Sequence, residues 1–265
     1  MKTNVGQLFK EAWNIFKFNT NLHIFSLVLV LSPKVVKELL LENPLLLFIY
    51  GVVGFAALVM TPLSMAGFVI VVQKYMRFEE DKFFEILSGA RIFFWRIVFF
   101  IIICSVFMLP VIIVNRVSPE TQTSTLYFLF YMGYFFTISL FTAVVIQGIV
   151  IDDLKTIPSI RNSIVFVKNN FKPILMTNLL IFIIPLVIKI FVLANFLPYS
   201  KLPFEAAFNL KTYQLFNSIK FNIVFNNISS FLLTPIQYII FSLIYYRKKI
   251  KDENAIGGLL FQEAG

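Results

Sequence analysis

The sequence predicts an all-α, polytopic integral membrane protein with six transmembrane helices, arranged as three hairpins that each follow a short two-faced helix. Hydrophobic residues make up 58% of the 265-residue chain and charged residues only 14%, whereas a soluble domain carries about 25% charged residues. The apolar residues form runs long enough to cross a bilayer. The short helices before three of these runs have one apolar and one basic face, which is typical of amphipathic helices that lie on a membrane surface.

The clearest two-faced helix begins at Ile157 and leads directly into the fifth apolar run. Ile160, Ile164 and Val167 recur at helical spacing on one side, and basic or amide side chains occupy the other. We expect this helix to lie on the cytoplasmic leaflet, with its basic side chains near lipid phosphate groups. The candidate headgroup contacts in this helix and in the first one are Lys10, Lys17, Arg161, Lys168 and Lys172.

The first two-faced helix is expected over residues 4–18. Asn4 can cap its start, and Gln7 follows at the spacing of a capping box. Its apolar face is expected to lie on the membrane or, alternatively, to pack on the protein's own cytoplasmic loops. A weaker apolar face precedes the third run, within residues 80–91.

The six spans follow in order along the chain. The first is the least regular, because Pro33, Lys34 and Lys37 interrupt it, and both lysines would have to extend toward the aqueous interface. The second contains several small residues, which let helices approach closely. The expected spans are Asn21–Leu41, Pro44–Val72, Ile92–Val114, Leu126–Ile151, Pro173–Phe196 and Asn222–Tyr246.

The positions of lysine and arginine give the orientation. Most of the 23 such residues fall in the N-terminal segment, in the connectors after the second and fourth spans, and in the C-terminal tail. The positive-inside rule therefore predicts a multi-pass protein of the cytoplasmic membrane with both termini in the cytoplasm. The N-terminus lacks the layout of a cleaved signal peptide, so the first span is expected to stay in place.

We expect one membrane domain over residues 1–251 and a polar cytoplasmic tail over 252–265. The domain divides into hairpin units 4–72, 80–151 and 157–246. Their similarity indicates an internal repeat or, alternatively, only the ordinary likeness of membrane hairpins.

Two stretches carry a resemblance to a known family. One is the basic, serine-containing helix Ile160–Lys168, and the other is the end of the last span, Leu233–Pro235 followed by Leu243–Arg247. Their layout resembles the six-span membrane domain joined to some bacterial glycerophosphodiester phosphodiesterases, and its free-standing relatives of unknown function. Relatives often place an acidic residue between the terminal tyrosine and the arginine, whereas Tyr246 directly precedes Arg247 here. The resemblance implies a role near lipids or the cell envelope, without a phosphodiesterase catalytic domain.

The sequence contains no recognisable catalytic motif. His23 is the only histidine and Cys104 the only cysteine, so a disulfide within the chain and a thiolate metal cluster are excluded. The patterns H-E-x-x-H, G-x-x-x-x-G-K-[ST] and G-x-S-x-G do not occur. Asp152 and Asp153 could converge with the acidic residues at 79–81, or they could simply balance the basic connectors. We therefore expect no enzyme activity, no catalytic or metal-binding residues and no cofactor.

Polar residues within the predicted spans offer a second kind of site. Lys189 lies midway through the fifth span, where a charge costs about 3 kcal/mol near the bilayer centre, so it would face a wet cavity or extend to the outer interface. Polar residues also recur every three or four positions along the sixth span, where they either bond neighbouring helices or line a polar path. The candidate cavity residues are Gln147, Asn178, Lys189, Asn226, Ser230 and Gln237.

The function expected from these features is a non-enzymatic membrane scaffold or accessory factor in lipid or envelope physiology. Its expected partners are membrane lipids, together with a membrane protein or a second copy of the chain. Nucleic acid is not an expected partner, because the net charge of +9 is spread over short connectors. The alternative is a transporter or exporter subunit with a polar path between the fourth, fifth and sixth spans. A third hypothesis, a lipid-modifying enzyme, needs Asp152 and Asp153 at a headgroup-sized pocket beside Arg161.

Overall fold

The computed structural model of the chain describes residues 5–27, 47–117, 125–196 and 231–250, and these residues are helical except for short turns. Helical segments at 20–27 and 231–250 accompany seven labelled helices. The labelled helices are α1 (Val5–Phe18), α3 (Leu47–Met76), α4 (Phe83–Val117), α5 (Thr125–Phe141), α6 (Val145–Ile151), α7 (Thr156–Asn169) and α8 (Phe171–Phe196).

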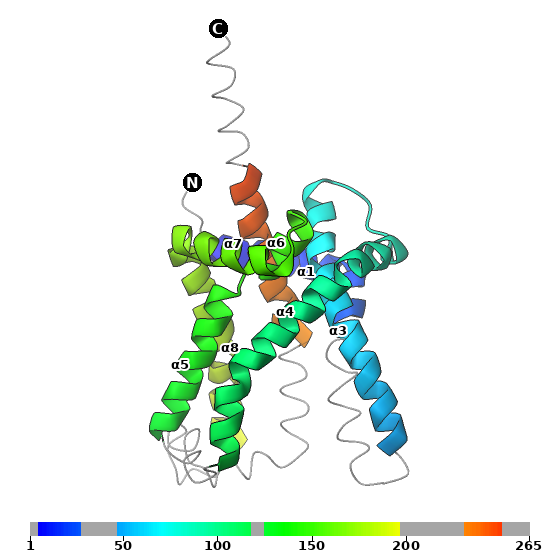
Figure 1. Cartoon of the computed structure of the whole chain (residues 1–265). Coiled ribbons are helices and arrows are strands. Elements are labelled where there is room, and N and C mark those ends of the chain that lie inside the picture. Colours follow the sequence, from blue (N-terminus) through cyan, green and yellow to red (C-terminus); the bar gives the residue numbers. More distant parts are fainter. Residues whose placement is uncertain (1–4, 28–46, 118–124, 197–230, 251–265) are drawn as a thin grey trace.

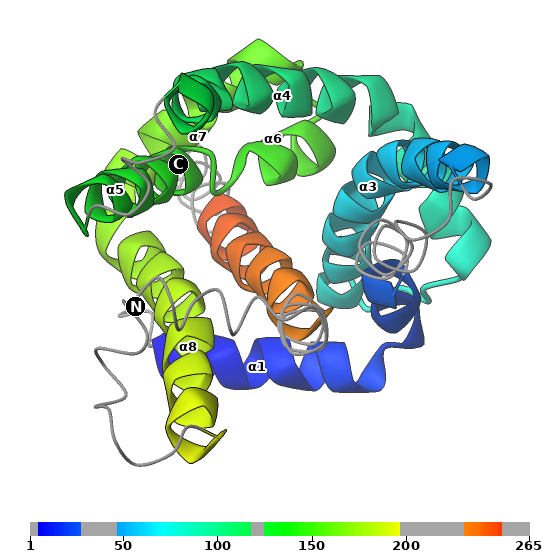
Figure 2. The same ribbon diagram turned by 90° about the horizontal axis from the view of Figure 1, so that it is seen from below.

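The helices form a bundle with a crosswise layer at one end. In Figure 1 the long helices α3, α5 and α8 run along the bundle and α4 crosses it obliquely, while α1, α6 and α7 lie across the upper end. Viewed along the bundle, helix 231–250 lies inside a ring made by the other helices (Figure 2). We call α1, α6 and α7 the crosswise layer.

Helix 231–250 supplies the centre of the main hydrophobic core. Its side chains Ile239, Ile240 and Leu243 have an exposed fraction of 0%, and residues from α1, α3, α7 and α8 join them in one buried cluster. This burial agrees with the central position of helix 231–250 in Figure 2.

Three helical stretches of the described chain are long and apolar enough to cross a membrane: Val59–Met76, Phe83–Val111 and Gly133–Ile151. The protein is thus all-helical in its described residues, with candidate membrane-spanning helices, as predicted. Most of the expected first span and the start of the sixth, together with the tail 252–265, lie outside the described residues. Six crossings and the three-hairpin arrangement therefore stay predictions.

Two helices differ from their predicted boundaries. The weak two-faced segment before the third span is not a separate helix, because α4 continues from Phe83 to Val117 without interruption. The single span predicted over Leu126–Ile151 is divided by a turn at residues 142–144 into α5 and α6. The physical reason for this division lies in contacts from α7, which are described below.

The apolar face of α1 packs within the protein. Leu8, Ala12 and Phe16 are buried, and the Phe16 ring makes edge contacts with His23 at 4.7 Å and with Phe231 at 6.0 Å between centroids. The predicted extent of this helix is confirmed. This face contacts the helices 20–27 and 231–250, and the predicted position of α1 at the membrane surface stays a prediction.

A close contact between segment 20–27 and α3 depends on Gly67. A Cβ atom at this position would lie 2.9 Å from ring atoms of Phe25. The Phe25 ring has little room to move, because it stacks on Phe83 at 5.4 Å and meets Phe68 edge-on at 6.2 Å. Gly133 is the opposite case, since a Cβ there would meet nothing within 4 Å.

We expect Gly67→Ala to lower the free energy of unfolding by about 1–3 kcal/mol through overpacking. Gly133→Ala should leave it unchanged or raise it by up to about 1 kcal/mol, because alanine favours the helix without meeting a neighbour. Thermal unfolding of the detergent-solubilised protein measures both effects. Equal midpoints for the two variants would contradict the assigned packing of segment 20–27 on α3.

Candidate functional site

The end of helix 231–250 carries polar residues that bond the crosswise layer. Tyr245 Oη donates a hydrogen bond to Asp152 Oδ2 and accepts one of 2.6 Å from Asn162 Nδ2. Lys249 Nζ lies 2.7 Å from the other carboxylate oxygen, Asp152 Oδ1. Asp152 directly follows α6 and Asn162 lies in α7, so this cluster ties the central helix to both.

The next two residues of the same helix bond other parts of the chain. Tyr246 Oη accepts a hydrogen bond of 3.4 Å from Arg77 Nε, at the end of α3, and this bond raises the pKa of Arg77. Arg247 Nη2 contacts both carboxylate oxygens of Glu11 in α1, at 2.7 and 2.6 Å. We call Tyr245, Tyr246, Arg247, Lys249 and their bonding partners the polar junction.

The polar junction contains the residues that supported the family resemblance. Tyr245, Tyr246 and Arg247 are consecutive, yet their partners belong to α6 and α7, to the end of α3, and to α1. Successive residues of a helix point about 100° apart, so three neighbours can reach three sides of the ring. The motif was visible in the sequence, but its partners were not.

The loop between α6 and α7 is fixed to α4. Arg96 Nη1 lies 2.6 Å from Asp153 Oδ1 and 2.9 Å from the Asp153 carbonyl oxygen. Thr156 Oγ1 donates a 2.7 Å bond to the Arg96 carbonyl oxygen. Asp153 has a φ of 54°, a left-handed conformation that needs support from its surroundings in a residue with a side chain. The contacts with Arg96 provide that support.

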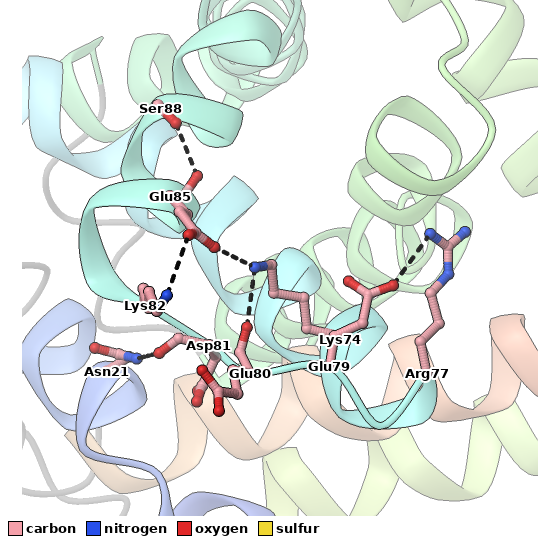
Figure 3. A network of polar contacts seen from close by, with 9 residues as sticks. All are labelled: Asn21, Lys74, Arg77, Glu79, Glu80, Asp81, Lys82, Glu85 and Ser88. Atoms are coloured by element: carbon pink, nitrogen blue, oxygen red, sulfur yellow. Dashed lines mark hydrogen bonds and ion pairs between the residues drawn. The ribbon is translucent and has the colours of Figure 1, made fainter.

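A second polar cluster holds the turn between α3 and α4 (Figure 3). Lys74 Nζ contacts Glu85 Oε2 at 2.9 Å and the Glu80 carbonyl oxygen at 3.0 Å. Asn21 Nδ2 donates a 2.7 Å bond to the Asp81 carbonyl oxygen. The acidic residues at 79–81 thus belong to this turn, whereas Asp152 and Asp153 bond Lys249 and Arg96. Among the described residues, no group of three or more His, Cys, Asp or Glu is placed to hold a metal ion.

Two of the predicted cavity residues, Gln147 and Asn178, are buried amides whose bonding partners the structure describes. Gln147 is buried in α6, where its Nε2 donates a 3.3 Å bond to Ser242 Oγ. Asn178 is buried in α8, and its Oδ1 accepts a 3.3 Å bond from Ser139 Oγ of α5. These two amides therefore bond different helices.

Of the other predicted cavity residues, the structure describes only part. Gln237 is half-buried in helix 231–250, and Lys189 belongs to α8 with its side chain outside the described part of the structure. Asn226 and Ser230 also lie outside the described residues. The three buried polar atoms without a hydrogen-bond partner in the described structure are Gln147 Oε1, Thr177 Oγ1 and Asn178 Nδ2.

The candidate headgroup contacts are all exposed. They are Lys10 and Lys17 on α1, Arg161 and Lys168 on α7, and Lys172 in the first turn of α8. Lys17 Nζ also lies 5.2 Å from the centre of the Phe18 ring.

The apolar face predicted for α7 is divided in the structure. The spacing placed Val167 and the aliphatic residues at 160 and 164 on one face turned to the membrane; Ile164 is 45% exposed, but Val167 is buried in the protein. The side that packs into the protein instead carries small residues at helical spacing. These are Thr156, Ser159 and Ser163, followed by Val167.

The opposite side of α7 mixes aliphatic and basic residues. Exposed fractions reach 58% for Ile157, 45% for Ile164 and 51% for Val165, and Arg161 and Lys168 are exposed between them. We call Ile157, Arg161, Ile164, Val165 and Lys168 the outer strip of α7. The spacing of three and four residues between the hydroxyl side chains was the sequence signal that could have revealed the buried face.

Comparison of the chain with protein-family models, with curated proteins and with solved structures found no match.

We expect Tyr245→Phe to lower the free energy of unfolding by about 1–3 kcal/mol, because it leaves Asn162 Nδ2 and an oxygen of Asp152 without their partner in a half-buried place. Tyr75→Phe serves as the control, since Tyr75 is 49% exposed. Denaturant unfolding of the detergent-solubilised variants gives the comparison. If both tyrosines can be replaced with the same small effect, the polar junction does not hold the layer to the central helix.

Proposed function

We propose that the protein is a non-enzymatic, multi-pass scaffold or accessory factor of the cytoplasmic membrane, acting in lipid or envelope physiology through contacts with anionic lipid. The observation that carries the proposal is the outer strip of α7. In this proposal the crosswise layer lies at the headgroup level of the cytoplasmic leaflet, with six spans and both chain ends on the cytoplasmic side. Membrane lipids are the partners.

The position of α7 supports a place at the membrane surface. Figure 1 shows α7 running across the ends of the long helices, and α8 begins at Phe171 directly after a turn at Asn170. An apolar helix that enters the bilayer fixes the depth of the helix just before it. In that orientation the aliphatic side chains of the outer strip reach the acyl boundary, while Arg161 and Lys168 extend to phosphate groups.

The α1 helix contributes in a different way. Its apolar face is occupied by the protein core, so only its outward residues are free for lipid. These include Trp13 at 45% and Phe18 at 78% exposure, beside the exposed Lys10 and Lys17. Aromatic rings next to basic residues are typical of the headgroup level.

We expect the double variant Arg161→Gln/Lys168→Gln to lose at least fivefold of its preference for anionic over zwitterionic lipid. Each basic residue near an anionic surface contributes about 1 kcal/mol. The measurement is native mass spectrometry of the full chain in nanodiscs that contain phosphatidylglycerol and phosphatidylcholine, counting the lipids that remain bound.

The matched control is Lys82→Gln. Lys82 is equally exposed but belongs to the turn between α3 and α4, beside acidic residues. The control should keep the anionic preference. A preference that survives in the α7 variant, or falls equally in the control, would reject the outer strip as the lipid contact.

A transporter or exporter subunit is the second candidate function. It is favoured by the unpartnered buried atoms Gln147 Oε1, Thr177 Oγ1 and Asn178 Nδ2, because buried polar groups within spans often line a substrate path.

To test this second function, Thr177→Cys is placed in a Cys104→Ala background and exposed to a water-soluble thiol reagent in membranes. If a polar path exists, the reagent should label Thr177→Cys rapidly, and solutes of substrate size that enter the path should slow this labelling. Labelling as slow as that of the native Cys104, which is half-buried on α4, would leave these residues as contacts between helices and remove the transport candidate.

A further inference from the structure

The break between α5 and α6 has an unusual hydrogen-bond pattern. In a continuous helix, the N–H of Val144 would bond the carbonyl of Leu140, and the N–H of Val145 would bond the carbonyl of Phe141. Instead, the Leu140 carbonyl accepts a 3.3 Å bond from the Ala143 N–H, and the Thr142 carbonyl accepts a 3.2 Å bond from the Val145 N–H. The N–H of Val144 and the carbonyl of Phe141 are among the backbone groups that lose their helical partners at the break.

Ser163 of α7 replaces both missing partners. Its Oγ donates a 2.8 Å bond to the Phe141 carbonyl oxygen and accepts a 3.4 Å bond from the Val144 N–H. Ser163 is fully buried and Val144 is 1% exposed, so water cannot take over these bonds. One hydroxyl on a neighbouring helix thus makes the break tolerable.

The α6 helix is held on α7 by a second close contact. Ser159 Oγ donates a 2.6 Å bond to the Val145 carbonyl oxygen. A Cβ atom on Gly148 would lie only 2.5 Å from the same Ser159 Oγ. Only glycine at position 148 allows α6 to lie this close to α7.

Nothing in the local sequence requires the break. Residues 125–151 contain neither proline nor a charged residue, and Gly133–Ile151 is apolar enough to form one membrane-crossing helix. A straight helix would restore both bonds that Ser163 now replaces. The broken form therefore depends on contacts from α7.

We infer that α5 and α6 form a two-state helix, broken when α7 lies against it and straight when α7 moves away, and that anionic lipid on the outer strip of α7 stabilises the broken state. The second half of this inference rests on the proposed function. The buried side of α7 holds the break, and the exposed side of the same helix meets the headgroups. The position of α7 thus links the break between α5 and α6 to the contact with the headgroups.

The polar junction would follow the state of this helix. Asp152 comes directly after α6 and bonds Tyr245 and Lys249 of the central helix. Straightening of α6 would carry Asp152 away from both partners. A change at the lipid surface would in this way reach the centre of the bundle.

The test measures the distance between spin labels by pulsed electron paramagnetic resonance, in the full chain in nanodiscs. Cys104, the only cysteine, is replaced by alanine, and labels are attached at Gly133→Cys on α5 and at Lys155→Cys after α6. Position 133 has open space for a label. In anionic nanodiscs the unaltered hinge should give one short distance.

We expect Ser163→Ala and Gly148→Ala to add a longer distance, approaching the axial rise of about 27 Å for a continuous helix over Gly133–Ile151. Ser105→Ala is the matched control, because Ser105 Oγ bonds its own helix at the Ile101 carbonyl. It should leave the distance unchanged. A single short distance in both α7-contact variants would overturn the two-state helix.

The lipid half is tested with the same labels. Zwitterionic nanodiscs, or Arg161→Gln/Lys168→Gln in anionic nanodiscs, should also add the longer distance. If Ser163→Ala lengthens the distance but lipid composition does not, the hinge is supported and its control by lipid is rejected. If the anionic preference survives in Arg161→Gln/Lys168→Gln in the lipid-binding experiment while Ser163→Ala still lengthens the distance, the proposed function fails and the hinge stands.

Discussion

The burial of helix 231–250 is the constraint on which the other contacts depend. This helix places Ile239, Ile240 and Leu243 at an exposed fraction of 0%, so neighbouring helices must pack against it around these residues, and close packing is what holds helices together within a bilayer. The polar junction lies where this buried helix emerges, one turn beyond Ser242, which bonds Gln147 inside the bundle.

The α1 and α7 helices contribute different kinds of side chain to the packing around helix 231–250. The α1 helix contributes large apolar side chains to the core, such as Leu8 and Phe16. The α7 helix contributes Ser159 and Ser163, which are small enough for close contact with α6. An approach of two helices at glycine and serine positions brings backbone atoms together and lets hydroxyl groups bond exposed carbonyls. Ile157, Ile164 and Val165 of α7 are then left to face outward.

The sequence was sufficient for the features that depend on composition and periodicity. The all-helical fold, the apolar stretches and the extent of α1 follow from runs and spacing that any membrane helix must show. The orientation of α7 did not follow. Hydrophobic periodicity grouped Ile164 and Val167 on one face turned to the membrane, whereas Val167 is buried together with the serine side that packs on Gly148. Such a choice depends on the partner surface, which a single sequence does not display.

The break after Phe141 was hidden from sequence reasoning for a related reason. A helix normally ends at proline, at glycine or at a capping side chain; residues 142–144 contain neither proline nor glycine, and the Thr142 hydroxyl bonds the Ile138 carbonyl of its own helix. Ser163, nineteen positions away from Val144 in the chain, bonds two of the backbone groups released at the break. In an apolar environment an unpaired backbone group costs several kcal/mol. A break is therefore favoured at a level where another helix supplies both a donor and an acceptor, and α7 lies at that level. The depth of α7 thus contributes to where α5 ends, which the residues of α5 alone do not reveal.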